Sequence, residues 1–294
     1  MQALDTRRRA ILADLVERLR EVDGVRAIVL GGSWARGRAR PDSDLDVGLY
    51  YEGTTPLDVD AVRALARELS PDRAETVTDL WAWGPWVNGG AWLTIESQPV
   101  DLLYRELDQQ RETLEAAERG EYELHFGQQP PFGFFSPTLL GEIEVAHVLH
   151  DPGNVLAPLK ERVATYPEAL RARVIGDFLW SAEFALEAFA RKSASRGDSY
   201  LTTATLARVC HALTLVLFAL NRVHLLNDKT ALDEIDAFGR RPNAFGSRIR
   251  RVLAEPGDTP TALGRSVASV REVFDECVAL TDGLYAPRHR LREG

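Results

Sequence analysis

Cysteine is scarce in this chain, which has only two among 294 residues, Cys210 and Cys277. Both lie in stretches with helical periodicity, and two isolated thiols do not form the network of paired cysteines that holds small secreted proteins together. The sequence therefore excludes a disulfide-rich class and predicts a protein of the reducing cytoplasm.

Long hydrophobic runs are also lacking. No stretch approaches the roughly 20 consecutive apolar residues that span a bilayer. The N-terminal segment, with Arg7-Arg8-Arg9 near its start, has no apolar core of the kind found in a secretion signal. Apolar residues make up 45% and charged residues 27% of the chain, which is typical of a globular protein in water, so we expect no membrane partner.

Positive charge is outnumbered by negative charge, and the formal net charge is −9. Only three of the 35 basic residues are lysines. A negative protein is repelled by polyanions, which disfavours duplex nucleic acid as a partner, although a local basic groove would still admit a tRNA. A negative surface suits a cationic small molecule equally well. The length permits one large domain or two ordinary ones.

The most informative residues that the sequence does contain are three aspartates in strand-like stretches. Asp44 and Asp46 are two residues apart at a strand-like stretch, where alternate side chains point to the same face. Asp101 lies between apolar residues in a later strand-like run. If these strands are neighbours, three carboxylates converge, and a divalent cation is the usual partner for such charge. Upstream, Gly32-Ser33 offers backbone N–H groups suited to a phosphate chain.

The order of these residues carries a specific resemblance. Gly32-Ser33, a ten-residue gap, Asp44-x-Asp46 and a distant Asp101 between apolar neighbours follow one another. This pattern resembles the nucleotidyltransferase superfamily that includes DNA polymerase beta and the aminoglycoside, lincosamide and minimal nucleotidyltransferases. Arg36-Gly37 and the stretch 41–44 inside the gap also look like the bacterial small-substrate branch. The resemblance covers the N-terminal third of the chain.

The resemblance implies an α+β fold, with a small mixed β-sheet nucleotidyltransferase domain over residues 1–130, flanked by helices, and an all-α helical bundle over residues 131–294. The active site is then expected in the cleft between the two domains. The implied activity is Mg²⁺-dependent transfer of a nucleoside monophosphate, most often AMP from ATP, to a hydroxyl group. Asp44 and Asp46 then hold two Mg²⁺ ions, Asp101 binds the catalytic ion and helps to take the acceptor proton, and Gly32 and Ser33 hold the β- and γ-phosphates.

Hydrophobic periodicity agrees with this division. It predicts helices over 3–22 and 59–69, strands over 25–30, 45–51, 91–96 and 99–104, and strand-like character over 76–92. Prolines and glycines over 126–133 mark a connector, after which Ser136 and Pro137 predict a helix start. Only helical periodicity follows, over 139–149, 156–189, 202–226, 232–238, 245–253 and 263–284.

Two basic residues are candidates for contacting phosphate. Arg36, in the loop after Ser33, either meets a phosphate or belongs to a solvated basic turn. Lys229 lies at the predicted start of a helix. In relatives of this architecture a lysine of the helical domain commonly reaches the triphosphate; otherwise Lys229 is an ordinary surface residue of a first helical turn.

Aromatic and acidic side chains are candidates for the acceptor. Four tryptophans are close in sequence: Trp81, Trp83, Trp86 and Trp92. We expect most of these rings to complete the core of the sheet, with one or two left to stack a nucleobase or an acceptor ring. Glu142 and Glu144 either bind amino groups of an acceptor or stay solvated on a helix face.

Three functions fit this sequence. The first is transfer of a nucleotide to a small molecule such as an aminoglycoside-like antibiotic, which would confer antibiotic resistance. The second is a toxin–antitoxin type of enzyme that modifies a protein or a tRNA. The third is a nucleotide-binding regulator without turnover, and the intact set of three aspartates argues against it.

Overall fold

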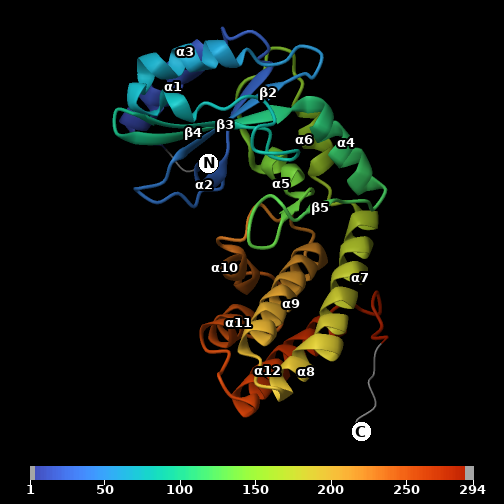
Figure 1. Cartoon of the computed structure of the whole chain (residues 1–294). Helices are drawn as coiled ribbons and strands as arrows, with labels where there is room; N and C mark the ends of the chain where they lie inside the picture. The colour runs from blue at the N-terminus through green and yellow to red at the C-terminus, as the bar shows by residue number, and fades with distance from the viewer. Residues whose placement is uncertain (1–3, 289–294) are drawn as a thin grey trace. The chain divides into compact units, whose positions relative to one another are not determined.

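A computed structural model describes residues 4–288, which form two compact units (Figure 1). The first unit contains the chain up to Ala116 together with Tyr122–Thr165, and the second contains Ala117–Glu121 and the chain from Tyr166 onward. The predicted α+β class is confirmed, because the first unit has a mixed sheet with flanking helices and the second is helical. The first unit extends past the predicted boundary at residue 130, since a later strand joins its sheet.

The first unit is built on a five-stranded sheet in the order β3-β4-β2-β1-β7. β2 and β4 run parallel, whereas the other neighbours are antiparallel. The strands are β1 (Ala27–Leu30), β2 (Leu45–Tyr51), β3 (Gly90–Ile95), β4 (Gln98–Glu106) and β7 (His147–His150). The predictions for β1 to β4 are confirmed, with ends that differ by at most two residues.

β7 corrects the expectation of one helix over 139–149. α5 (Thr138–Val145) ends at Ala146, and the next four residues pair antiparallel with β1. Apolar residues at 145, 148 and 149 continue the helical spacing of α5, so periodicity alone did not separate helix from strand. Ser136 does not cap this helix, because its hydroxyl accepts the N–H of Glu123.

One face of the sheet is apolar and packs against α1 (Thr6–Leu19) and α3 (Val59–Leu69), which lie on the same side of it (Figure 1). Alternate residues of the strands supply this face, including Leu45, Val47 and Val100, each with no exposed surface. Asp58 caps α3 through the N–H of Ala61, and the chain leaves the helix at Ser70 as predicted.

The opposite face carries polar residues and meets α5. Arg105 of β4 is 3% exposed, and its Nε and Nη2 donate to the Glu142 carboxylate at 2.7 and 3.1 Å. Burial lowers the pKa of the Arg105 guanidinium, but the Glu142 charge more than compensates, so this pKa stands above its ordinary value. Glu142 is therefore engaged in fixing α5 to the sheet, so the alternative of a freely solvated side chain on a helix face is wrong, and its contact with an acceptor stays a prediction.

β3 is an edge strand, and its outer side is covered by the 3-10 helix η1 (Pro71–Thr76) and the residues around it. Alternate N–H groups of β3 donate to hydroxyl oxygens at 2.9–3.0 Å: Gly90 to Thr78, Trp92 to Thr76 and Thr94 to Ser70. These hydroxyls occupy donors that would otherwise be open to another strand. The strand-like character predicted over 76–92 is wrong before Gly90, because residues 77–89 form turns, bends and irregular structure.

The remaining elements of the first unit connect these layers. α4 (Leu107–Glu118) continues directly from β4, and α6 (Ala157–Val163) follows β7. β5 (Leu124–His125) and β6 (Phe134–Phe135) pair at the two ends of the predicted connector over 126–133. The connector therefore forms a closed loop within the first unit.

The second unit is a set of packed helices. They are α7 (Glu168–Phe184), the π-helical η2 (Ala185–Ala190), α8 (Arg191–Ser195), α9 (Ser199–Leu220), α10 (Ala231–Asp236), α11 (Phe245–Ala254) and α12 (Pro260–Ala279). The helix predicted over 156–189 is thus divided among α6, α7 and η2. α9 packs against α7, η2 and α12 and forms the core of the unit.

α9 is long and apolar enough to cross a membrane by length and composition, which a search for uninterrupted apolar runs missed. Within the protein, 72% of its most apolar window is buried. A helix at the core of a globular unit passes the same test, so α9 is weak evidence for a membrane span.

Both cysteines belong to this helical unit, and both are free and buried. Burial raises the pKa of the Cys210 thiol to about 12. The thiolate form needed for reaction or metal binding is therefore disfavoured.

The Arg105–Glu142 pair generates a stability prediction. We expect Glu142→Ala to lower the free energy of unfolding by about 3 kcal/mol, because it leaves a buried guanidinium without its counter-charge. Urea unfolding followed by circular dichroism measures the loss. As a control, Glu115→Ala on the exposed side of α4 should change stability by less than about 0.5 kcal/mol. Equal stability of the two variants would contradict the prediction.

Candidate active site

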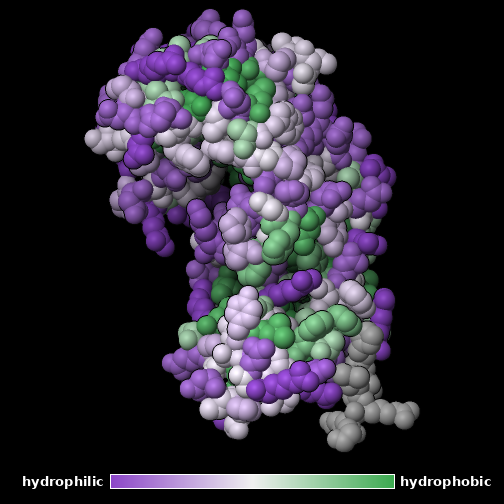
Figure 2. Space-filling model, in the orientation of Figure 1, coloured by the Kyte–Doolittle hydropathy of each residue, from purple (hydrophilic) through white to green (hydrophobic). Residues whose placement is uncertain are grey.

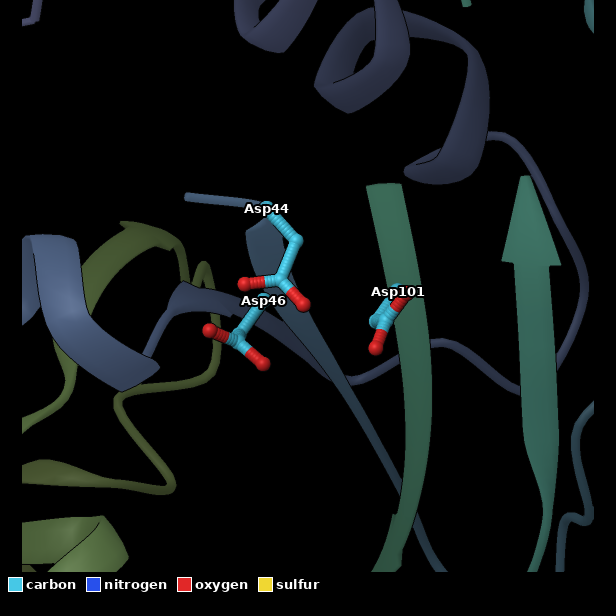
Figure 3. A group of neighbouring side chains, drawn as sticks. All are labelled: Asp44, Asp46 and Asp101. Carbon is cyan, nitrogen blue, oxygen red and sulfur yellow. The ribbon is translucent and has the colours of Figure 1, made fainter. Parts of the chain in front are cut away.

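Three aspartates meet on the polar face of the sheet (Figure 3). β2 and β4 pair in parallel with Asp46 directly opposite Asp101, and Asp44 lies just before β2 begins. One carboxylate oxygen from each residue lies within 4.8 Å of the others, and all three side chains are partly exposed. The predicted convergence of Asp101 on Asp44 and Asp46 is confirmed.

The chemistry of this donor set fits a hard divalent cation. Three carboxylates at this separation repel one another, and a cation bound between them removes that cost. All the donors are oxygens, which Mg²⁺ prefers, and partial exposure leaves room for the water and phosphate ligands that Mg²⁺ retains. The three residues are therefore a candidate magnesium site.

Glycine at position 32 is required by the Asp46 carboxylate. Gly31 extends the pairing of β1, because its N–H donates to the Asp46 carbonyl at 2.8 Å, and the chain then turns into α2 (Gly32–Ala35). Gly32 has a φ of +57°, and a Cβ built on it would overlap Asp46 Oδ2. The close approach brings the backbone of the Gly-Ser turn against a carboxylate of the candidate magnesium site.

Ser33 and Arg36 lie on this turn. Ser33 Oγ is covered from solvent and has no hydrogen-bond partner among the described residues, so its hydroxyl is available to a ligand that enters the turn. Arg36 is the partly exposed residue that ends α2. Its contact with a phosphate stays a prediction.

The position of Asp44 depends on two residues that the sequence analysis missed. Gln98 at the start of β4 is buried, and its Nε2 donates to the Ser43 carbonyl at 3.1 Å. Arg8 of α1 donates Nε to Gln98 Oε1 at 2.7 Å and also bonds to the Pro41 carbonyl. These contacts fix the loop before Asp44 to the sheet. Neither residue belongs to a motif, so their role became visible only in three dimensions.

The tryptophans do not complete the core as expected. Trp92 is 51% exposed and pairs across the strands with Asp101, so its side chain lies on the same face as the aspartates. The Trp83 ring stacks on the Trp92 ring with centroids 4.7 Å apart. The expectation that most of these rings fill the core is therefore wrong, because the apolar cluster behind the sheet does not include them.

Lys229 belongs to the second unit and is exposed. Its backbone N–H donates to Asn227 Oδ1 at 3.0 Å, and α10 begins two residues after it, at Ala231, one residue before the start predicted at 232. Its contact with the triphosphate stays a prediction.

Comparisons with known proteins show what this chain is similar to. Residues 12–116 match the family described as a nucleotidyltransferase domain, and residues 136–229 match a domain of unknown function, DUF4037. No curated protein is significantly similar in sequence to this chain. A crystal structure of a nucleotidyltransferase-like protein from Exiguobacterium sibiricum 255-15 has 10% identity and a TM-score of 0.45, over 94% of this chain and 76% of that one.

The matched nucleotidyltransferase span contains the Gly-Ser turn and all three aspartates. This match over residues 12–116 supports assignment of the chain as a transferase with a domain similar to nucleotidyltransferases. The nucleotide, the acceptor and the branch within the superfamily belong to the proposal below.

The contact between Gly32 and Asp46 generates a prediction. We expect Gly32→Ala to lower nucleotidyl transfer by at least about a hundredfold, because an added methyl group displaces the Asp46 carboxylate. Gly31→Ala is the matched control, since a Cβ there would meet Asp46 atoms at ordinary contact distances of 3.8 and 3.9 Å. Transfer rates of the two variants at saturating Mg²⁺ provide the comparison, and equal rates would show that the close approach has no catalytic importance.

Proposed function

We propose that this protein transfers a nucleoside monophosphate, AMP from ATP, to a hydroxyl group of a small-molecule acceptor and releases pyrophosphate. The observation that carries the proposal is the convergence of three carboxylates beside a Gly-Ser turn within a nucleotidyltransferase domain. An aminoglycoside-like compound is the acceptor class that a protein of net charge −9 suits through its amino groups.

The aspartates divide the work of metal binding and proton removal. Asp44 and Asp46 would hold two Mg²⁺ ions, and Asp101 would hold the catalytic one. When bound, Mg²⁺ neutralises charge on the attacking and leaving oxygens and lowers the pKa of the acceptor hydroxyl. Asp101 helps to take the hydroxyl proton as the new oxygen–phosphorus bond forms and the bond from the α-phosphorus to the pyrophosphate oxygen breaks.

The Gly-Ser turn would hold the leaving group. The backbone N–H groups of Gly32 and Ser33, with the unpartnered Ser33 hydroxyl, are suitable donors to the β- and γ-phosphates. Arg36, the residue that follows α2, adds a positive charge to the same turn. Positioning and charge neutralisation are the main requirements of this reaction, and these residues supply both.

Tracing of labelled nucleotide tests the proposal. The protein is incubated with Mg²⁺ and each of four α-labelled nucleoside triphosphates, with an aminoglycoside panel, total cellular protein or tRNA. Label from ATP in an aminoglycoside supports the proposal. Label in protein or tRNA would favour a toxin–antitoxin type of enzyme, and tight nucleotide binding without label in any pool would favour a regulator.

Removal of one carboxylate tests the metal site. We expect Asp44→Asn, Asp46→Asn and Asp101→Asn each to lower turnover by at least about a hundredfold while leaving the fold intact, because each removes a charge that binds Mg²⁺. Chelation of Mg²⁺ should abolish turnover in the unaltered protein. Mg²⁺ should also raise its melting temperature, and this increase should disappear in the variants.

Asp42→Asn is the matched control, since Asp42 is an exposed aspartate of the same loop. It should keep both turnover and the Mg²⁺-dependent increase in melting temperature. Full activity of Asp46→Asn would defeat the assignment of the metal site.

Lys229 gives a separate prediction for the helical unit. We expect Lys229→Gln to raise the KM for the nucleotide severalfold with little change in kcat, because it removes a charge that binds phosphate in both the ground state and the transition state. Lys192→Gln, at an exposed lysine of α8, is the control and should leave KM unchanged. An unchanged KM in Lys229→Gln would make Lys229 an ordinary surface residue.

A further inference from the structure

The site residues lie in a single row across the sheet. Trp92 of β3 is opposite Asp101 of β4, Asp101 is opposite Asp46 of β2, and Gly31 at the end of β1 bonds to Asp46. Neighbouring strands are separated by about 4.8 Å, so successive members of the row are one such step apart. The row has the Gly-Ser turn at one end, the carboxylates in the middle and an aromatic ring at the other end.

The aromatic end is held rigidly from both sides. The Trp92 backbone is fixed by Thr76, whose Oγ1 accepts the Trp92 N–H at 3.0 Å. Its ring stacks on Trp83, and the loop that carries Trp83 is fixed by the buried Gln128. Gln128 Nε2 donates to the Trp83 carbonyl at 2.6 Å, and Gln128 Oε1 accepts the Trp86 N–H at 2.9 Å.

This rigidity leaves a flat surface beside the carboxylates. Trp92 keeps 51% of its surface exposed although it is stacked on Trp83 and bordered by Asp101. An indole fixed in place loses little conformational entropy when a flat ligand stacks on it, so it is suited to binding a ring.

We propose that Trp92, supported by Trp83, is the acceptor platform: it binds a ring-shaped acceptor that carries the reacting hydroxyl on its edge. This inference rests on the proposed function. In nucleotidyl transfer the attacking oxygen and the leaving pyrophosphate lie roughly in line on opposite sides of the α-phosphorus. With pyrophosphate on the Gly32–Ser33 end of the row, the acceptor approaches from the opposite end, which is the Trp92 end.

The spacing between neighbouring strands agrees with binding of the acceptor ring by Trp92. A ring that lies against Trp92 is one strand spacing from Asp101, so a hydroxyl on its edge is directed toward the carboxylate that takes the proton. The nucleoside is attached to the α-phosphorus by a bond that lies out of the attack line, which directs the base away from the row. The platform therefore serves the acceptor and not the nucleobase.

The experiment compares Trp92→Ala, Trp92→Phe and the control Trp81→Ala, which removes another exposed tryptophan of the same unit. In the first arm, calorimetry measures the binding of α,β-methylene-ATP with Mg²⁺. In the second arm, transfer of labelled AMP from ATP is measured with kanamycin as a cationic ring probe, lincomycin as a second ring probe and 1,4-butanediol as a hydroxyl probe without a ring.

We expect all variants to bind the nucleotide analogue with the same affinity, within about twofold. Trp92→Ala should raise the KM for a ring probe about tenfold, which corresponds to about 1.4 kcal/mol, with little change in kcat. Trp92→Phe should recover most of the affinity for the ring probe. Trp81→Ala should leave the KM unchanged. Butanediol should be a poor acceptor in every case.

Three results would overturn the inference while the proposed function stands. They are loss of nucleotide affinity in Trp92→Ala, which would assign the platform to the nucleobase; an unchanged KM for the ring probes in that variant; and transfer by the unaltered protein to butanediol but to neither ring probe. Failure of the unaltered protein to bind the nucleotide analogue with Mg²⁺ would instead overturn the proposed function, and the platform with it.

Discussion

The parallel pairing of β2 and β4 is the constraint on which the site depends. Its register places Asp46 directly beside Asp101, and repulsion between such close carboxylates opposes the arrangement. The same strands overcome this cost on their other face, where residues such as Leu49 and Leu102 are buried against α1 and α3. A shift of one residue in this register would exchange the two faces, burying Asp46 or Asp101 and exposing leucine. The apolar core therefore fixes the position of the carboxylates.

Short-range contacts then fix what the sheet alone does not. Gly32 brings the turn against Asp46 because it has no side chain, and Gln98 and Arg8 hold the loop that ends at Asp44. Arg105 lies four residues after Asp101, and its charge also acts on Asp46. Glu142 balances that charge from α5, so the polar face has a network of alternating charge beneath the site.

The sequence allowed the three aspartates, the Gly-Ser turn and strands β1 to β4 to be predicted, because each has a local signal in alternation or spacing. β7 was missed because four residues carry too little pattern to compete with the helical spacing of α5. Gln98, Gln128 and Thr76 were missed for a different reason. Each acts through a few polar contacts with segments distant in sequence, and no periodicity or motif encodes such contacts.

The two ends of the row across the sheet differ in how freely their residues can be substituted. At the turn, any side chain added to Gly32 meets the Asp46 carboxylate, so this end of the row cannot vary without displacing that side chain. At the other end β3 is an edge strand, completed by the hydroxyls of Ser70, Thr76 and Thr78 and, within residues 4–288, by no further strand. Side chains on β3 and in the Trp83 loop can therefore be replaced without altering the register of β2 and β4. The acceptor platform proposed above therefore lies on the part of the sheet that is freer to change in sequence.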